Sequence, residues 1–495
     1  MPSASRNVVA NLTATVISVA AGVAAVPIIV RALGLDAYGL VGFHAMLATI
    51  LSAFDLGLSP SITRELARRS VVHGELGSYL ATVMTIVWLV GLALGGCIAT
   101  GSGLIASTWL SGETAAPVIM LMGAAIAAQW PAAAYRAALN GLERQVVASV
   151  ISASAVVART LGVAVLLVAG GGGVMTYFVA QIAISVVETL ATRMALRHHL
   201  TPADRHARPR ISALHGTLGF TSQIAVAGIL GLVLTQVDRI VVSWKLPLED
   251  LGLYTVAATL GSGIFRLAAP ILSVAIPRFA KLAAVHDRER LGASMRDFAQ
   301  AVAIGVLPVG ATIAALPTAS LLAWGQESAV VTGAAGATSL LVAGTSLHCL
   351  LHAPYALLLA FGAARSAVVF NACTLMILVP SVIIGTMHFG IEGAAIGWLV
   401  VVAVAFAGPV IALVAFLVPG FARPWVFGDV VAPVVAASAI PIGIALTVPT
   451  PTSRIGALAA IAIAWTMSTL ATALAVPVGR RLLARARRAL SPTPS

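Results

Sequence analysis

The feature that most constrains this chain is the recurrence of apolar stretches of about 20 residues along its whole length. One such stretch is long enough to cross the hydrocarbon core of a bilayer as an α-helix. The composition agrees, because 59% of the 495 residues are hydrophobic and only 9% are charged, whereas a soluble domain carries about 25% charged residues. A water-soluble enzyme is therefore excluded, and the sequence predicts an all-α, polytopic membrane protein.

Polar, glycine and proline residues divide the apolar sequence into about 14 predicted transmembrane helices. Six form a first block, six a second block, and two a last pair. In chain order they fall near 8–30, 37–61, 78–101, 115–138, 146–168 and 173–196; near 217–243, 251–276, 298–324, 330–361, 366–387 and 391–418; and near 429–449 and 455–478.

Positive charges lie mostly at one end of these predicted spans. If the N-terminus is cytoplasmic, the outer segments hold only Arg31, Lys245 and Arg454 of the 29 arginines and lysines. Because arginine and lysine concentrate on the cytoplasmic side of membrane proteins, both termini are predicted to be cytoplasmic. This distribution accounts for most of the net charge of +12 without nucleic acid as a partner. Basic amphipathic segments near 62–77 and 277–297, and in the tail, predict interfacial helices that contact anionic membrane lipids.

The two six-span blocks resemble each other. LGLDAYGL at 33–40 aligns with LPLEDLGL at 246–253, and LNGLERQ at 139–145 aligns with AFGAARS at 360–366. Six spans return the chain to its starting side, so the blocks are parallel repeats, an arrangement typical of transporters with a substrate site between the halves. The predicted domains are an N-lobe of helices 1–6 (1–210), a C-lobe of helices 7–12 (211–420), and helices 13–14 with a basic cytoplasmic tail (421–495).

Five segments resemble the recurring motifs of Wzx-type polysaccharide flippases, which belong to the multidrug, oligosaccharidyl-lipid and polysaccharide exporter superfamily. They are PIIVRALGLDAYGL (27–40), FDLGLSPSITRELA (54–67), YRAALNGLERQ (135–145), TQVDRIVVSWKLPLEDLGLY (235–254) and GIEGAAIGWL (390–399).

This resemblance implies two six-helix lobes with an accessory helix pair. It also implies alternating-access transport of an isoprenoid-diphosphate-linked oligosaccharide from the inner to the outer leaflet of the bacterial plasma membrane, for cell-surface polysaccharide biosynthesis. Such a protein is not an enzyme and carries no cofactor. A coupling ion and polysaccharide-assembly proteins remain open as partners.

Arginines inside the predicted spans are the candidate substrate-binding residues. A charged side chain at the bilayer centre costs about 2.5 to 3.5 kcal/mol, so it usually faces a polar cavity or a partner. A diphosphate suits guanidinium groups, which stay charged and donate forked hydrogen bonds. We therefore expect Arg159 and Arg266, which lie nearest mid-span, to bind the lipid diphosphate. Arg31, Arg239 and Arg136 are further candidates that could instead extend to the membrane interface.

Acidic residues in the same spans offer a second role. Asp55, Asp238 and Glu188 are candidates for ion coupling or gating. The alternative is that they pair with the arginines and only hold helices together. The repeat places Arg266 opposite a position two residues from Asp55, which predicts a salt bridge between the two that an anionic substrate would compete with.

Other patterns do not support metal or enzyme chemistry. His348 and His352 share one helix face, but the segment reads HCLLH rather than the HExxH of a zinc site, so an interior pair is favoured over a metal site. Two alternatives to a flippase remain: a multidrug or other small-molecule antiporter of the same superfamily, and a membrane enzyme that processes glycans. Mid-span arginines disfavour the first, and short outer loops disfavour the second.

Overall fold

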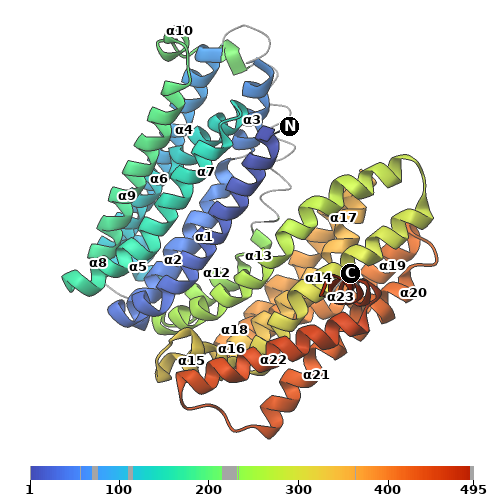
Figure 1. Cartoon of the computed structure of the whole chain (residues 1–495). Helices are drawn as coiled ribbons and strands as arrows, with labels where there is room; N and C mark the ends of the chain where they lie inside the picture. The colour runs from blue at the N-terminus through green and yellow to red at the C-terminus, as the bar shows by residue number, and fades with distance from the viewer. Residues whose placement is uncertain are drawn as a thin grey trace. The chain divides into compact units, whose positions relative to one another are not determined.

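The computed structural model describes residues 2–55, 57–69, 76–109, 115–214, 231, 233–362 and 364–490. Over these ranges the chain is almost entirely helical and has no β-strand, which confirms the predicted all-α class. The chain divides into two compact units (Figure 1). The N-terminal unit comprises Met1–Gln236 with Leu246–Gly252, and the C-terminal unit comprises Val237–Lys245 with Leu253–Ser495.

The N-terminal unit is built around α6, which packs between α4 and α9 (Figure 1). Helices α4 and α6 approach closely because Gly95 and Gly123 face each other, and a Cβ on either glycine would meet the backbone of the other helix. The described elements of this unit are α1 (Pro2–Leu33), α2 (Leu35–Ser52), η1 (Ala53–Asp55), α3 (Leu58–Arg69), α4 (Leu76–Thr100), α5 (Ser102–Trp109), α6 (Ala115–Gly141), α7 (Gln145–Val157), η2 (Ala158–Gly162), α8 (Val163–Gly170), α9 (Val174–His198), α10 (Pro202–Arg205) and η3 (Ile211–Leu214).

The C-terminal unit is built around α14, which packs against α16, α21 and α22. Buried Phe279, Phe298 and Trp425 lie in its apolar core. Its described elements are α12 (Val237–Lys245), α13 (Leu248–Ala284), α14 (Arg288–Ala315), α15 (Pro317–Trp324), α16 (Ser328–Leu350), α17 (His352–Ala360), α18 (Ala364–Ala407), α19 (Pro409–Leu417), α20 (Ala422–Pro424), η4 (Trp425–Val431), α21 (Ala432–Thr447), α22 (Arg454–Ala475) and α23 (Pro477–Leu490).

The described residues contain 12 helical segments long and apolar enough to cross a membrane. One of them, Val368–Leu417, is 50 residues long. It kinks at Phe389 and Gly390, where the glycine adopts φ +58°, and it therefore accounts for two predicted spans. The predicted span at 217–243 lies largely outside the described residues. The structure is thus consistent with the predicted total of about 14 helices.

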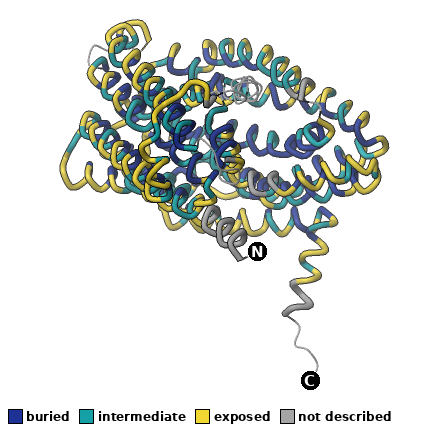
Figure 2. Tube along the Cα trace, turned by 90° about the horizontal axis from the view of Figure 1, so that it is seen from above, coloured by how far each residue is buried: buried dark blue, intermediate teal, exposed yellow. Residues whose placement is uncertain are grey.

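Exposed positions recur along the helices (Figure 2), and many of them carry large apolar side chains. Leu104, Met194 and Leu446 are examples of large side chains that are mostly exposed. A soluble monomer rarely exposes extended apolar patches, whereas such surfaces are favourable in contact with lipid tails. The chain is therefore a multi-pass membrane protein.

Two predicted segments differ from the observed helices. The span predicted at 37–61 ends earlier, because α2 stops at Ser52 and a short 3₁₀ turn separates it from α3. The interfacial helix predicted at 277–297 is not a separate element, since α13 continues to Ala284 and α14 begins at Arg288. The basic tail does form a helix, α23, and its contact with anionic lipid remains a prediction.

Candidate functional site

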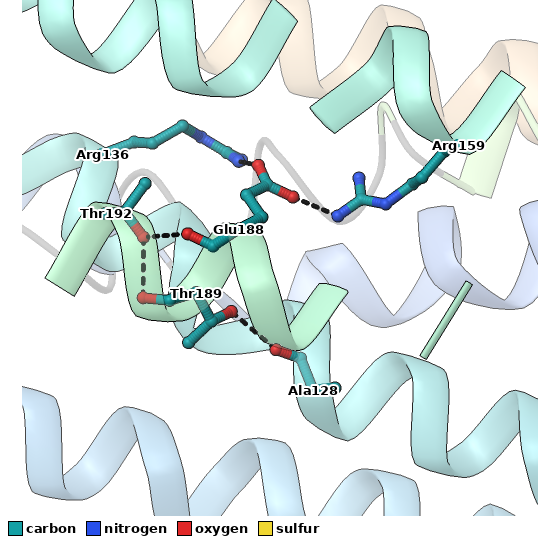
Figure 3. A network of polar contacts seen from close by, with 6 residues as sticks. All are labelled: Ala128, Arg136, Arg159, Glu188, Thr189 and Thr192. Atoms are coloured by element: carbon teal, nitrogen blue, oxygen red, sulfur yellow. Dashed lines mark hydrogen bonds and ion pairs between the residues drawn. The ribbon is translucent and has the colours of Figure 1, made fainter. Parts of the chain in front are cut away.

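Three charged side chains meet inside the N-terminal unit, and we call Arg136, Arg159 and Glu188 the Glu188 cluster. Figure 3 shows the Glu188 carboxylate between two guanidinium groups that reach it from opposite sides. Arg136 Nη1 lies 2.5 Å from Glu188 Oε1, and Arg159 Nη2 pairs with Oε2. The Glu188 side chain is 1% exposed, against 13% for Arg159 and 29% for Arg136. One buried carboxylate therefore serves two arginines that retain partial access to the surface.

A π-helical turn presents Arg159 to this cluster. Residues Ala158–Gly162 form the π-helical turn η2 between α7 and α8. The wider turn departs from the regular α-helical hydrogen-bond pattern, and the Arg159 carbonyl accepts a hydrogen bond from Gln181 Nε2 at 3.1 Å. Such turns are frequent at functional sites. The sequence alone offered no signal for η2.

Helix α9 is fixed against α6 beside Glu188. The Thr189 hydroxyl donates to the Ala128 carbonyl at 2.7 Å, and the Thr192 hydroxyl donates to the Glu188 carbonyl at 2.8 Å (Figure 3). Both threonines are buried. The Thr189 bond therefore joins α9 to α6 next to Glu188, whereas the Thr192 bond lies within α9.

The Glu188 cluster has more hydrogen-bond donors than acceptors. Two guanidinium groups and one carboxylate leave one surplus positive charge, and Arg159 Nε is buried without a hydrogen-bond partner. His44 on α2 packs its ring 5.3 Å from that of Phe178, and its Nε2 atom is also buried without a partner. A buried polar group left unpaired costs about 1 to 3 kcal/mol. An additional anionic acceptor would satisfy the surplus charge.

The remaining candidates of the N-terminal unit lie elsewhere. Arg31 is exposed in the last turn of α1. Asp55 lies in η1 rather than within a span, and its carboxylate accepts hydrogen bonds from the Ser59 backbone N–H and hydroxyl, each at 3.1 Å. Burial raises the pKa of the Asp55 carboxyl, and the two hydrogen bonds from Ser59 act in the opposite direction. Asp55 therefore caps the start of α3.

In the C-terminal unit, the Asp238 carboxylate accepts two hydrogen bonds from nearby residues. The Tyr254 hydroxyl donates to Asp238 Oδ2 at 2.6 Å, and the Arg239 backbone N–H donates to Oδ1 at 2.9 Å. Arg266 is exposed on α13, and within the described ranges its guanidinium makes neither an ion pair nor a hydrogen bond. The predicted Asp55–Arg266 pair joins residues of different units and stays a prediction.

A second buried carboxylate was missed by sequence reasoning. Asp429 lies in the π-helical turn η4, and its side chain is fully buried. Arg296 donates to both Asp429 oxygens at 2.6 and 3.1 Å, and Gln300 donates to Oδ1 at 2.6 Å. Gln300 Oε1 in turn accepts from the Val478 backbone N–H at 2.9 Å, which connects α14 to α23. The sequence signal for this site was Asp429 itself, an acidic residue at the start of the predicted span at 429–449.

The described residues hold no cluster of three or more histidine, cysteine or acidic side chains suited to a metal ion. His348 and His352 instead pack among aromatic rings, and the His352 Nδ1 atom lies 2.9 Å from the Cys349 carbonyl. His352 is buried, as expected of an interior residue, whereas His348 is half-buried.

The chain belongs to the polysaccharide biosynthesis protein family, whose model matches residues 4–283. This agrees with the family that the motifs predicted. No curated protein sequence matches the chain.

Solved structures share its fold. The lipid II flippase MurJ in an inward closed conformation is 14% identical, with 96% of this chain and 99% of that chain covered and a TM-score of 0.76. An inward-facing multidrug resistance MATE family transporter of the MOP superfamily is 16% identical, with 82% of this chain and 98% of that chain covered and a TM-score of 0.64. A MOP superfamily transporter from Pyrococcus furiosus is 15% identical, with 83% of this chain and 96% of that chain covered and a TM-score of 0.55. The family and the fold together support a membrane transporter or flippase of the MOP superfamily.

Proposed function

We propose that this protein is a flippase that moves an isoprenoid-diphosphate-linked oligosaccharide from the inner to the outer leaflet of the bacterial plasma membrane, for cell-surface polysaccharide biosynthesis. The observation that carries the proposal is the Glu188 cluster, in which two guanidinium groups share one buried carboxylate. The family supports a role in polysaccharide biosynthesis. The fold likeness to a lipid II flippase supports a lipid-linked cargo.

In this proposal the diphosphate supplies the acceptors that the cluster lacks. Phosphate oxygens suit the forked donors of Arg136 and Arg159, and charge-assisted hydrogen bonds of this type are stronger than neutral ones. Glu188 holds both guanidinium groups in place before substrate arrives, which reduces the cost of ordering them. The carboxylate also competes with the phosphate for the same donors, so that the substrate can be released after translocation.

The other arginines and acids take supporting roles in the proposal. Arg31, Arg239 and Arg266 are further contacts for the anionic headgroup. Asp55 and Asp238, with Glu188, are the groups that could couple transport to an ion or gate it. Both termini are cytoplasmic, anionic membrane lipids contact the basic segments, and no cofactor or nucleic acid takes part.

The fold also suits a multidrug antiporter, since MATE transporters share it. A cationic drug would be repelled by the surplus positive charge of the Glu188 cluster, whereas a diphosphate is attracted. The cluster therefore favours an anionic cargo.

The test is deletion of the protein in its host, followed by analysis of lipid-linked glycans. The proposal predicts that an isoprenoid-diphosphate-linked oligosaccharide accumulates on the inner leaflet and that surface polysaccharide is lost. Expression of the wild type should restore export, and Arg159→Ala at equal membrane level should not. Arg193→Ala is a matched control, because Arg193 is an exposed arginine on the same helix as Glu188. Unchanged glycolipids combined with new drug sensitivity would instead identify an antiporter.

A further inference from the structure

Four aromatic or imidazole rings gather in the C-terminal unit, and we call Phe265, His348, His352 and Trp398 the ring cluster. They come from α13, α16, α17 and α18. The His348 ring stacks on Phe265 with centroids 5.8 Å apart and lies 5.0 Å from the Trp398 ring. His352 lies edge-on to Phe265 at 4.9 Å and to His348 at 5.7 Å. The rings of Phe265, His348 and Trp398 thus form one continuous row.

This row is partly exposed and has hydrogen-bonding groups with no partner among the described residues. Phe265 is 38% exposed, and His348 and Trp398 are half-buried. In the part of the chain that the structure describes, neither the His348 ring nitrogens nor the Trp398 indole N–H makes a hydrogen bond. A tryptophan N–H and a histidine ring normally find partners when they pack inside a protein. The row therefore offers polar groups along its edge as well as ring faces.

The position of Trp398 depends on a glycine in the neighbouring helix. A Cβ added at Gly344 on α16 would lie 2.8 Å from Trp398 Cδ1 and 3.3 Å from its Nε1. Real Cβ atoms essentially never approach a neighbour below 3.0 Å. Gly344 thus makes room for the indole beside His348.

A charged side chain lies next to the row along α13. Arg266 follows Phe265 directly and is exposed. An exposed guanidinium within an apolar span is costly in hydrocarbon and is expected to face an aqueous cavity. The His348 ring and the Trp398 indole N–H, which make no hydrogen bond among the described residues, also suit a polar partner. The exposed side of α13 at this point therefore suits a polar ligand with an apolar face.

We propose that Phe265, His348 and Trp398 form a binding surface for a sugar ring of the transported glycan. A pyranose has apolar C–H faces that pack on the negative face of an aromatic ring, and its hydroxyl edge matches imidazole and indole hydrogen-bonding groups. Arg266 is adjacent and is a candidate phosphate contact, so the sugar next to the diphosphate is the one that this surface binds. The inference rests on the proposed function and names the part of the cargo that this row binds.

The test compares two probes with the protein reconstituted in nanodiscs. One probe is undecaprenyl diphosphate, and the other is undecaprenyl diphosphate carrying a single N-acetylglucosamine. We expect the wild type to bind the sugar-bearing probe about 3- to 10-fold more tightly, the size of a good ring contact. Phe265→Ala and Trp398→Ala should each remove most of this preference without changing the affinity for the sugar-free probe. Phe265→Tyr should keep it.

Control variants separate binding from misfolding. Phe416→Ala removes an exposed ring on α19 that makes none of the ring contacts of this cluster, and it should leave the preference unchanged. Elution volume and melting temperature check that each variant is folded. Gly344→Ala should displace Trp398 and so weaken the preference for the sugar-bearing probe. This loss is not expected if Phe265 only stabilises the fold.

The possible outcomes separate the two proposals. If the wild type binds both probes equally, or if Phe265→Ala and Trp398→Ala retain the preference, the sugar surface is overturned and the proposed function stands. If Phe265→Ala weakens both probes equally, the ring contacts lipid or diphosphate and the inference also fails. If the wild type binds neither probe, the proposed function itself fails.

Discussion

Among the described residues, a deeply buried carboxylate in each unit is associated with a π-helical turn, yet the two are paired differently. In the C-terminal unit, Asp429 in η4 is matched by a single arginine, Arg296, and by the amide of Gln300. In the N-terminal unit, Glu188 faces two arginines, one of them carried by η2. The first arrangement is balanced and connects three segments of chain. The second has a surplus positive charge and unsatisfied donors, so the ratio of arginine to carboxylate distinguishes a structural site from a candidate binding site.

The largest effect on folding is expected at the balanced site. Asp429→Ala would leave Arg296 and Gln300 without their shared acceptor, and breaking a buried ion pair from one side costs about 3 to 5 kcal/mol. Since Arg296 is partly exposed, the lower end of this range applies. We expect a large loss of folded protein in detergent, measured by fluorescence-detected chromatography and melting temperature. Normal yield and melting would contradict a structural role for Asp429.

The next largest effect is on transport. Arg159→Ala removes a guanidinium from the Glu188 cluster but leaves Arg136 to pair with the carboxylate, so the fold should survive. Loss of a charge-assisted hydrogen bond of about 1.5 to 3 kcal/mol predicts a 10- to 100-fold drop in glycan export. Arg159→Lys should recover part of it, because lysine keeps the charge and loses the fork. Export at the wild-type rate in Arg159→Ala would remove this residue from the site.

Glu188→Gln tests whether the carboxylate competes with substrate. The amide keeps the size of the side chain and frees both guanidinium groups from their counter-charge. We expect undecaprenyl diphosphate to bind several-fold more tightly while turnover slows, because release becomes harder. Equilibrium binding and a flipping assay on the same reconstituted sample measure the two quantities. Weaker binding would show that Glu188 only positions the arginines.

Asp55 is a third carboxylate and offers a contrast, since Ser59 rather than arginine is its described partner. Burial raises the pKa of Asp55 in the folded state above its value in the unfolded state. Between these two pKa values the folded protein binds more protons than the unfolded chain, so stability falls as pH rises through this interval. Asp55→Asn should therefore increase the melting temperature slightly at pH 7 and have little effect below the ordinary carboxyl pKa. A gain that is equal at both pH values would exclude titration of Asp55 as its cause.

The smallest effect is expected on the surface of the balanced site. Arg481 on α23 pairs with Asp297 at 2.6 Å, and both side chains are largely exposed. Exposed pairs of this kind contribute about 0 to 1 kcal/mol. Arg481→Ala should leave export unchanged and shift the melting temperature by a few degrees at most. A severe loss of export would assign α23 a role beyond packing.

Much of the fold was predictable from the sequence because long apolar stretches leave the backbone little choice but a helix in a membrane. Glu188 was identified as a possible partner of Arg159 because it is an acid within a span. That Arg136 joins them from α6 depends on helix packing, which no local pattern specifies. Asp429 was missed because Arg296 was assigned to an inner loop, whereas it lies within α14. No local sequence pattern indicated the π-helical turns or the break after Ser52 either.

The claim that the Glu188 cluster binds a diphosphate is tested most directly by equilibrium binding to the protein in nanodiscs. The measurement compares undecaprenyl diphosphate with undecaprenol for the wild type, the double variant Arg136→Ala with Arg159→Ala, and the control Arg193→Ala. The account predicts that only the diphosphate binds tightly, that the double variant loses at least about 100-fold in affinity, and that the control matches the wild type. Equal binding of the diphosphate by the double variant and the wild type would contradict it.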